Sequence, residues 1–412
     1  MKWKKKKLSE FCEFSNGLWT GKKPPFKTVG VIRNTNFTKD CQLDDSDIVY
    51  LEVEQSQFQK RKLQYGDIIL EKSGGGPKQP VGRVVIFDKT EGDFSFSNFT
   101  SVIRIKNKKE VDFNFLHRYL FLEYISGATE KMQSHSTGIR NLKFDEYKEI
   151  EIPLPSLPEQ QRIVSILDEV FAAISKAKAN ADQNLKNAKE LFESYLQGVF
   201  ENGNWEEKEL GDLCLLITKG SSPKWQGIKY VDEPGILFVT SENVGEGKML
   251  LNERKYVEEK FNLKDKKSIL KKGDVLTNIV GASIGRTAIY DIDDVANINQ
   301  AVCILRCNPK YILNNYLMNL LNSPFLKKIL HDNEVNTARA NLSLGFFNKL
   351  SIPCPTIAEQ QTIVRQLDAL RAETQKLEAV YQKKIDDLEE LKKSILQKAF
   401  VGELKTEKVE KV

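Results

Sequence analysis

The chain has 412 residues, enough for two or three domains of ordinary size. Apolar residues make up 40% of it and charged residues 29%, a composition that is typical of globular proteins and argues against a disordered chain. No apolar run reaches the length of a membrane span, and the basic residues 1–7 are followed by polar residues rather than by the apolar core of a secretory signal.

The positive charge is unevenly distributed. The net charge is +5; residues 1–150 hold 26 Lys and Arg against 20 Asp and Glu, whereas residues 357–412 hold 11 of each. A basic excess suits a polyanionic partner but does not identify one. Of the six scattered cysteines only Cys303 and Cys307 lie close together, and with three histidines no zinc-ligand spacing emerges. We therefore expect no metal site, and reduced thiols in a cytoplasmic protein.

Residues 1–150 are predicted to form a first domain of the α+β class. Short β-type runs such as 84–87 and 101–105 alternate with turn signals, and one short helix is predicted over 115–124. The lysines 4–7 are expected to form a frayed end that attracts phosphates, although a solvated tail is a nearly equal alternative. Gly74 to Gly76 could cradle a phosphate, but a mobile or tight-turning loop is the better interpretation.

Residues 151–204 are predicted to contain a long helix. Pro155 and Pro158 precede it, and Glu159 and Gln160 stand in its first turn, as a helix N-terminus prefers. From Ile163 onward, apolar or small residues recur at steps of three and four, with one four-residue slip, which is a heptad-like pattern. Some 43 residues at about 1.5 Å each make a rod of roughly 65 Å.

Residues 205–350 are predicted to form a second α+β domain, with short β-type runs and a short helix over 315–321. This domain echoes the first one faintly, because three short motifs recur in the same order. They are Gly66-Asp67 and Gly273-Asp274, Gly82-Arg83 and Gly285-Arg286, and Asn141-Leu142 and Asn341-Leu342.

Residues 351–412 repeat the long helix. Segment 352–400 aligns with segment 152–200 without a gap, 19 of the 49 positions are identical, and the slip in the apolar pattern falls at the same place. Two matching seams predict that the helices pack against each other as a coiled coil; the alternative is one amphipathic helix on the surface of each domain. The packing residues are predicted to be Ile163, Leu167, Ile174, Leu185, Tyr195, Ile363, Leu367, Leu377, Ile385 and Leu388.

The two Ile-Pro-x-Pro…Glu-Gln-Gln-x-Ile-Val…Leu-Asp blocks, at 152–168 and 352–368, carry a resemblance to a known family. Together with the Gly-Asp…Gly-Arg…Asn-Leu order in each domain, they make essentially the whole chain similar to the specificity subunit of type I restriction–modification systems. The resemblance implies a non-catalytic subunit with two target recognition domains, each reading one half of a split site in double-stranded DNA. It also implies that the two helices pack antiparallel as a spacer, in a pseudo-two-fold symmetric molecule.

The same resemblance implies protein partners. Two methyltransferase (modification) subunits would dock on the long helices and, through them, the restriction and translocase subunits of the full complex. S-adenosylmethionine, ATP and Mg²⁺ are expected to serve those partner subunits, whereas no cofactor and no membrane partner is expected for this chain.

Contacts with DNA are expected from polar and basic residues on loops, since such side chains bind phosphates and base edges. For any single residue, an ordinary solvated side chain is about as good an interpretation, and Asn141 and Asn341 could be structural or helix-capping instead. The candidates in the first domain are Lys72, Ser73, Lys78, Arg83, Gln133, Ser134, His135, Thr137 and Arg140. Those in the second domain are Lys219, Ser221, Ser222, Lys224, Ser283, Arg286, Thr337 and Arg339.

No catalytic motif emerges from the sequence. It holds no Gly-x-Gly-x-x-Gly, no Gly-x-x-x-x-Gly-Lys phosphate loop and no Asn/Asp-Pro-Pro-aromatic tetrapeptide, and the three histidines form no recognisable triad. Two other classes stay open. A nuclease or methyltransferase with an unrecognised site would turn over DNA as the purified chain. A protein–protein scaffold would be excluded by a salt-dependent, sequence-specific DNA shift of the assembled complex.

Overall fold

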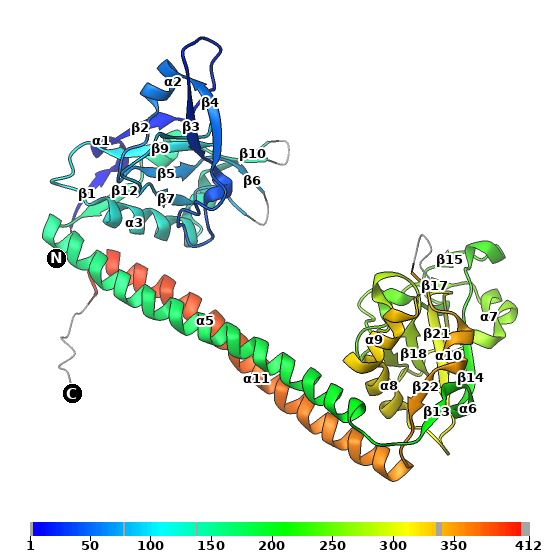
Figure 1. The fold of residues 1–412 in the computed structure, drawn as a ribbon. Coiled ribbons are helices and arrows are strands. Elements are labelled where there is room, and N and C mark those ends of the chain that lie inside the picture. Colours follow the sequence, from blue (N-terminus) through cyan, green and yellow to red (C-terminus); the bar gives the residue numbers. More distant parts are fainter. Residues whose placement is uncertain (1–2, 77–78, 137–138, 335–339, 405–412) are drawn as a thin grey trace, which may run out of the picture. The chain divides into compact units, whose positions relative to one another are not determined.

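The computed structural model of the chain describes residues 3–76, 79–136, 139–334 and 340–404. It divides into two compact units: unit 1 comprises residues 1–181 and 383–412, and unit 2 comprises residues 182–382. Each unit holds one α+β domain and a part of each of two long helices, so the division between the units falls inside the helices (Figure 1). No helix among the described residues is long and apolar enough to cross a membrane.

The first domain is built around an antiparallel four-stranded sheet in the order β2-β9-β5-β7. A second sheet, in the order β4-β3-β8, pairs β3 with β8 in parallel. The strands are β1 (Lys4–Lys7), β2 (Cys12–Asn16), β3 (Phe26–Ile32), β4 (Val49–Glu54), β5 (Ile68–Glu71), β6 (Ser73–Gly75), β7 (Val84–Ile86), β8 (Phe94–Phe96), β9 (Thr100–Ile105), β10 (Gln133–Ser136), β11 (Ile139–Leu142) and β12 (Glu151–Leu154). The helices are α1 (Leu8–Phe11), α2 (Gln55–Lys60), α3 (Phe113–Ile125) and α4 (Phe144–Lys148), with 3₁₀ turns η1 (Asn34–Asn36) and η2 (Ala128–Met132).

Strand β5 is buried on both of its faces, which explains its uninterrupted Ile-Ile-Leu sequence. Ile68 and Leu70 join the core that includes helix α3, whereas Ile69 joins the core beneath β3 and β8. Helix α3 begins where Asp112 caps it, with the Asp112 carboxylate accepting hydrogen bonds from two backbone N–H groups of the first turn at 2.8 and 3.0 Å.

The lysine run is a strand rather than the frayed end that the sequence suggested. Strand β1 pairs antiparallel with β12, which immediately precedes the first long helix. Lys5 lies 3.5 Å from the carboxylate of Glu151, and Lys7 lies 2.6 Å from that of Glu149. The partner strand lies about 145 residues away in sequence, so no local pattern could have revealed it.

The second domain repeats the first. Its four-stranded sheet has the order β14-β21-β18-β19, and its second sheet, in the order β15-β17-β16-β20, again contains one parallel pair. The strands are β13 (Glu207–Glu209), β14 (Cys214–Lys219), β15 (Tyr230–Val231), β16 (Ile236–Val239), β17 (Tyr256–Val257), β18 (Val275–Asn278), β19 (Thr287–Ile289), β20 (Ala296–Ile298), β21 (Val302–Cys307) and β22 (Ser351–Pro353). The helices are α6 (Leu210–Leu213), α7 (Lys260–Lys264), α8 (Asn314–Asn322), α9 (Pro324–Asp332) and α10 (Leu344–Lys349), with 3₁₀ turns η3 (Lys224–Gln226), η4 (Ser241–Asn243), η5 (Lys266–Ser268) and η6 (Gly281–Ser283).

The repeated Gly-Asp motif has a structural role in both domains. The Asp67 carboxylate accepts a hydrogen bond from the backbone N–H of Gln64 at 2.7 Å and pairs with Arg104 on β9 at 2.6 Å. Asp274 does the same with the backbone N–H of Lys271 and with Arg306 on β21. The motif therefore closes the turn before the central strand and ties that strand to its neighbour.

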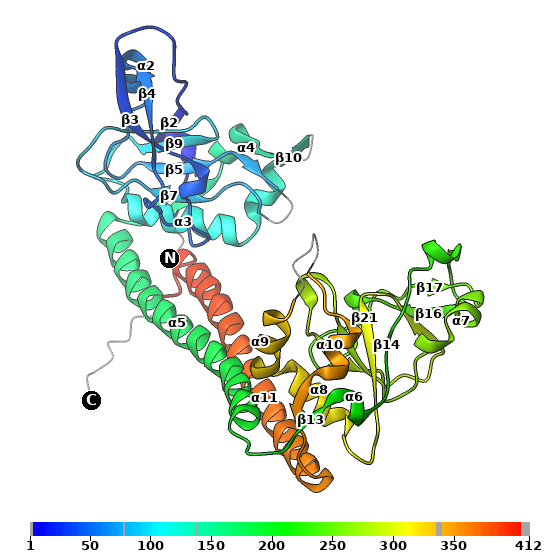
Figure 2. The same ribbon diagram turned by 45° about the vertical axis from the view of Figure 1, so that its right-hand side comes forward.

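The two long helices are α5 (Leu157–Glu201) and α11 (Ile357–Phe400). Within unit 1, the first half of α5 packs against the end of α11: Ile163 and Leu167 share a core with Leu396 and Phe400, and Lys178 pairs with Glu389. Figure 2 shows these two segments side by side in green and red. Because higher numbers on one helix meet lower numbers on the other, the packing is antiparallel.

Unit 2 contains the equivalent packing between the end of α5 and the first half of α11. Leu196 and Phe200 share a core with Ile363 and Leu367, and the guanidinium of Arg371 lies 4.9 Å from the ring centroid of Phe192. Within each unit, the predicted antiparallel pairing of the helices is thus confirmed.

Most of the predicted seam residues are buried, and two are not. Ile163, Leu167, Ile174, Ile363, Leu367 and Ile385 are buried, and Leu185 and Leu388 are partly buried. Tyr195 and Leu377, however, are 39% and 41% exposed. In α5, the buried or partly buried positions follow four-residue steps from Ala188 through Phe192 and Leu196 to Phe200, so the contact lies one residue after Tyr195. In α11, Thr374 is 2% exposed and Glu378, one residue after Leu377, is partly buried. At both places the contact position lies one residue after the predicted one.

Candidate nucleic-acid interface

In the first domain, two candidate segments that lie far apart in sequence meet at one edge. Strands β10, β11 and β6 form a three-stranded sheet, in which Asn141 pairs with Ser73 and Arg140 with Gly75. The Ser73 hydroxyl donates a hydrogen bond to Oδ1 of Asn141 at 2.5 Å. The Ser134 hydroxyl donates to the Asn141 carbonyl at 3.4 Å. Asn141 is therefore structural: it holds the candidate edge together.

Lys72 begins this edge and is half-buried. Its ammonium donates a hydrogen bond to Oδ1 of Asn16 at 2.8 Å, and burial lowers the pKa of the lysine. Gly74 and Gly75 lie in β6, and the backbone N–H of Gly76 donates to the carbonyl of Gln79 at 2.9 Å. Gly74 has a φ of +94°, and a Cβ on Gly75 would lie 2.7 Å from the carbonyl oxygen of Gln79. This close backbone approach fits the tight-turning loop, one of the two predicted alternatives to a phosphate cradle.

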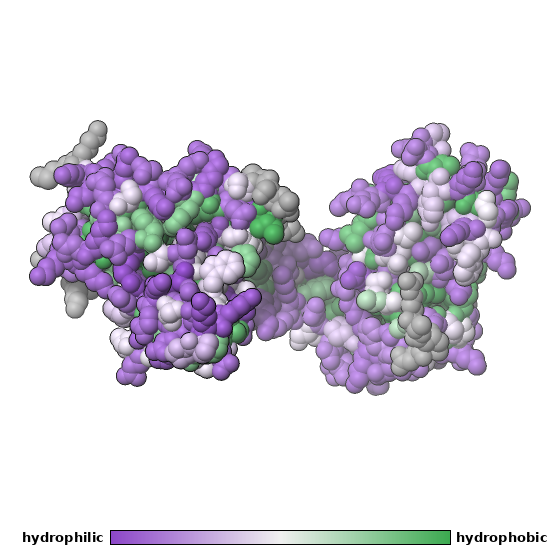
Figure 3. Space-filling model, turned by 90° about the horizontal axis from the view of Figure 1, so that it is seen from above, coloured by the Kyte–Doolittle hydropathy of each residue, from purple (hydrophilic) through white to green (hydrophobic). Residues whose placement is uncertain are grey.

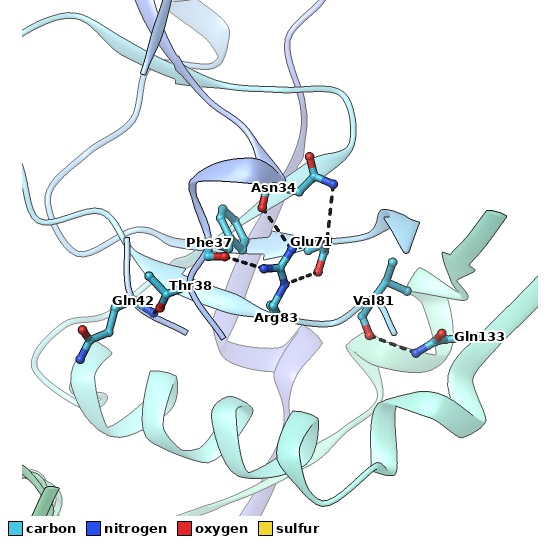
Figure 4. A network of polar contacts seen from close by, with 8 residues as sticks. All are labelled: Asn34, Phe37, Thr38, Gln42, Glu71, Val81, Arg83 and Gln133. Carbon is cyan, nitrogen blue, oxygen red and sulfur yellow. Dashed lines mark hydrogen bonds and ion pairs between the residues drawn. The ribbon is translucent and has the colours of Figure 1, made fainter. Parts of the chain in front are cut away.

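Two candidates of the first domain are buried in the fold instead of facing a partner. Arg83 is 5% exposed, and its guanidinium makes a bidentate pair with Glu71 at 2.8 Å for both contacts, Nε–Oε2 and Nη2–Oε1. It also donates to the carbonyl oxygens of Asn34 and Phe37 (Figure 4). Gln133 is also 5% exposed and donates to the carbonyl of Val81 at 3.0 Å. Both side chains hold loops in place.

In the second domain, the first candidate cluster consists of Lys219, the last residue of β14, and of residues in the loop that follows. Lys219 and Lys224 are exposed, and Ser222 is partly exposed. Ser221 is committed to the fold, because its hydroxyl donates to Oδ2 of Asp265 and accepts from Gln226, both at 2.5 Å. The loop therefore presents its lysines from an anchored backbone.

The same loop exposes Trp225 by 86%, a residue that the sequence reasoning passed over. A large aromatic side chain between Lys224 and Gln226 in a polar loop was the available signal. The equivalent loop after β2 exposes Trp19 by 67%. Exposed aromatic rings beside lysines can stack on bases or wedge between them, so both belong in the candidate interface.

Two further candidates of the second domain, Ser283 and Arg286, lie beside a similar edge. Val280 pairs with Asn341, and the backbone N–H of Gly281 donates to the carbonyl of Ala340 at 2.9 Å. Ser283 and Arg286 lie just beyond this pairing, and Arg286 is exposed. Segments 280–286 and 340–342 thus match the β6–β11 edge of the first domain.

Several candidates cannot be placed. Lys78, Thr137, Thr337 and Arg339 lie outside the described residues, and for His135 only the backbone, in strand β10, is described.

The predicted helix-start glutamines make contacts that the sequence reasoning missed. Gln160 and Gln360 are completely buried in the first turns of α5 and α11. Oε1 of Gln160 accepts from the backbone N–H of Asp112 at 2.9 Å, and its Nε2 donates to the carbonyls of Glu110 and Pro155, each at 2.9 Å. Gln360 makes the same three bonds at 2.8 to 2.9 Å, to the equivalent segment before α8 and to Pro355. Each glutamine thus fixes a long helix to its own domain.

The far ends of the helices are fixed by aromatic side chains. In unit 1, the ring of Phe400 lies 5.1 Å from that of Phe115 and 5.0 Å from that of Tyr119 on α3. In unit 2, the ring of Phe200 lies 5.5 Å from that of Tyr316 on α8. One helix start and one helix end therefore dock on each domain.

The face of each domain that Figure 3 shows is mostly hydrophilic, with small and separate apolar spots. Such a face suits a polar or charged partner better than an apolar one. Among the residues that the structure describes, no group of three or more His, Cys, Asp or Glu side chains could hold a metal ion. All six cysteines are free thiols.

A family model described as the type I restriction modification DNA specificity domain matches residues 1–183 and 202–389. The chain belongs to this family. Each of the two matches spans one recognition domain and a large part of its adjoining long helix, which agrees with the internal repeat.

Curated specificity subunits are similar over most of the chain. The type I restriction enzyme EcoBI specificity subunit of Escherichia coli is 26% identical over 345 residues, covering 76% of this chain and 72% of that protein. The StySPI specificity subunit of Salmonella potsdam is 26% identical over 395 residues, covering 91% and 82%.

Solved structures share the fold over nearly the whole length. A chain from a study of complex assembly and conformational transition of the type I R-M system has a TM-score of 0.79 at 20% identity, covering 98% of each chain. The HsdS subunit from Thermoanaerobacter tengcongensis has a TM-score of 0.61 at 19% identity, covering 98% and 97%.

Proposed function

We propose that the chain is the sequence-reading subunit of a type I restriction–modification complex and recognises a bipartite DNA site, one half per domain. The observation that carries this proposal is duplication with divergence. The two domains share sheet order, turn chemistry and helix docking, yet their polar edges differ in sequence. Since base readout depends on the side chains at such edges, two unlike edges on one scaffold suit two unlike half-sites.

The long helices, in this proposal, carry the protein partners. Two methyltransferase subunits dock on them, and restriction and translocase subunits join through those. The exposed sides of α5 and α11 are rich in charged residues, which suits a polar docking surface. S-adenosylmethionine, ATP and Mg²⁺ serve the partner subunits, and the complex acts in the cytoplasm. This chain contributes recognition and no chemical step.

A domain exchange tests the proposal. Residues 1–150 are replaced by those of another specificity subunit, and the methylated sites are mapped in cells that also express the partner subunits. We expect one half-site to change and the other to stay. The reciprocal exchange of residues 205–350 should change only the other half. A change of both half-sites in either chimaera would contradict independent reading by two domains.

The two competing classes give different results. If the purified chain alone methylated or cut DNA, it would be an enzyme. If the assembled complex showed no salt-dependent, sequence-specific binding to DNA, the chain would be a scaffold.

A further inference from the structure

The repeated Gly-Arg motif occupies the same backbone position in both domains. In the first domain, the backbone N–H of Glu71 donates to the carbonyl of Arg83 at 2.8 Å, and that of Gly82 donates to the carbonyl of Glu71 at 3.0 Å. In the second domain, the backbone N–H of Asn278 donates to the carbonyl of Arg286 at 2.9 Å, and that of Gly285 donates to the carbonyl of Asn278 at 3.0 Å. Glu71 is therefore equivalent to Asn278, and Arg83 to Arg286.

In each domain, a neighbouring 3₁₀ turn has two backbone carbonyls at equivalent positions that accept hydrogen bonds from a side chain. The turns η1 and η4 are equivalent, because both are closed in the same way. The side-chain oxygen of Asn36 accepts a hydrogen bond from the backbone N–H of Arg33, and that of Asn243 accepts one from Thr240, each at 2.9 Å. In the first domain, the carbonyls of Asn34 and Phe37 in and after η1 accept hydrogen bonds from Arg83. Glu71 holds the arginine in position (Figure 4).

The second domain meets the same need with a different residue. Nδ2 of the completely buried Asn278 donates to the carbonyl of Ser241 at 2.9 Å and to that of Val244 at 3.5 Å. These carbonyls are the equivalents of Asn34 and Phe37. Asn278 thus does alone what the Glu71–Arg83 pair does in the first domain.

The substitution releases Arg286. Its side chain is exposed, and among the residues that the structure describes it makes no hydrogen bond and no ion pair. It lies just after Ser283 on the edge that segment 340–342 completes. An exposed guanidinium that has no partner among the described residues presents the donor fork that matches O6 and N7 of guanine in the major groove.

We infer that Arg286 is a specificity-determining residue that reads a guanine in the half-site of the second domain, whereas Arg83 is a structural residue with no contact to DNA. This inference rests on the proposed function, and it assigns opposite roles to two arginines of one repeated motif.

The test compares Arg286→Lys and Arg286→Gln with the wild-type chain in the assembled complex, by methylome mapping and by binding to duplexes altered at one base pair. The half-site of the second domain is first assigned by the 205–350 exchange. We expect roughly 10- to 100-fold weaker discrimination at one G·C pair of that half-site, an unchanged first half-site and an unchanged melting temperature. Lysine keeps the charge but lacks the fork, so it should not restore discrimination.

Two variants serve as matched controls. Arg83→Lys should lower the melting temperature and leave both half-site sequences as they are. Asn278→Glu should capture Arg286 in a pair like that of the first domain and reproduce the loss caused by Arg286→Gln; if this variant does not fold, the Arg286 variants decide alone.

Three outcomes would overturn the inference. One is discrimination that Arg286→Gln leaves intact. Another is an Arg286→Gln variant that binds all duplexes more weakly by the same factor, with a shallower salt dependence and no change in base preference. That result would indicate a phosphate contact. The third is a loss of discrimination at an A·T pair of the second domain's half-site instead of at a G·C pair. If the wild-type complex recognised no split site at all, the proposed function itself would fail.

Discussion

Gln160 and Gln360 show how much a single side chain contributes to this architecture. The two residues stand in identical Glu-Gln-Gln motifs, and each motif supplies one buried and one exposed glutamine. The buried one makes hydrogen bonds to three backbone groups outside the regular helix bonding. Unpaired buried groups each cost about 1–3 kcal/mol, so this position is sensitive.

Replacing Gln160 with Ala should therefore destabilise unit 1 by about 2–4 kcal/mol, because it leaves the Asp112 N–H and two carbonyls without partners. Gln360→Ala should do the same in unit 2. The measurement is hydrogen exchange on the full chain, which should quicken in α3 for the first variant and in α8 for the second. The exposed neighbours provide the controls: Gln161→Ala and Gln361→Ala should leave exchange unchanged. Equal effects of Gln160→Ala and Gln161→Ala would disprove the docking role.

His117 adds a pH dependence to unit 1. It is 3% exposed, and burial, assisted by the charge of Arg118, lowers its pKa from 6.5 to about 4. The unfolded chain takes up a proton below pH 6.5 while the folded chain does not, so this residue destabilises the fold as the pH falls from 6.5 toward 4. The full effect is about 3 kcal/mol.

The equivalent residue in unit 2 is the buried Met318, which suggests the variant His117→Met. Its unfolding free energy should vary less between pH 7 and pH 4 than that of the wild type, whatever the difference at pH 7. Urea denaturation at several pH values measures this. Parallel curves for the two proteins would mean that His117 does not titrate on unfolding.

At the scale of elements, the sequence predicted the long helices well and their contact stripe only in part. The apolar period and the helix-start signals place α5 and α11 to within a few residues of their observed bounds. The exposure of Leu377 could not be predicted, because the inward-facing positions on either side of it are polar: Thr374 is 2% exposed and Glu378 is partly buried. Which of two neighbouring positions faces the partner helix depends on the packing of both helices.

The polar edges of the two domains were likewise predicted only in part. The Gly-Asp and Gly-Arg motifs correctly marked equivalent positions in the two domains. They did not reveal that Arg83 is buried, because its partner Glu71 and the carbonyl of Phe37 come from separate strands and turns. Two identical Gly-Arg motifs can therefore have different roles when the residues around the arginine differ.

Two leucines of α11, one buried and one exposed, provide a direct test of the observed contact face. Leu396 is completely buried, so Leu396→Ala should cost about 2–5 kcal/mol of stability. Leu377 is 41% exposed, so Leu377→Ala should cost at most about 0.5 kcal/mol. Thermal unfolding of the two variants measures the difference. Similar costs would support the predicted seam, in which Leu377 packs, instead of the observed contact face.

At the scale of the whole molecule, the chain consists of two units that share a fold, a docking scheme and two continuous helices. Each helix begins on one domain and ends docked on the other, through Gln160 and Phe200 for α5 and through Gln360 and Phe400 for α11. If the helices set the gap between two half-sites, their length between the docking points is the quantity that matters.

Lengthening both helices tests this. Four helix-favouring residues are inserted after Ala181 and four after Gln382, the two places where the chain passes between units, so that no docking residue shifts within its own unit. Each insertion adds about 6 Å to its helix and rotates the remainder of that helix by about 40°. At roughly 3.4 Å per base pair, the unspecified gap should change by one or two base pairs, with both half-sites unchanged.

Methylome mapping of cells that express the lengthened chain with its partner subunits measures the gap. The control replaces only the exposed residues 182–184 and 383–384 with residues of the inserted sequence at constant length, so that Leu185 and Ile385 stay in place, and it should keep the original gap. If that control is active and the lengthened chain methylates the original site, the helices do not set the spacing. If instead the lengthened chain is inactive, purified complex and duplexes with gaps altered by one and two base pairs separate the cases. Binding to one of these duplexes would show that the spacing moved as expected and that only the methyltransferase geometry was lost.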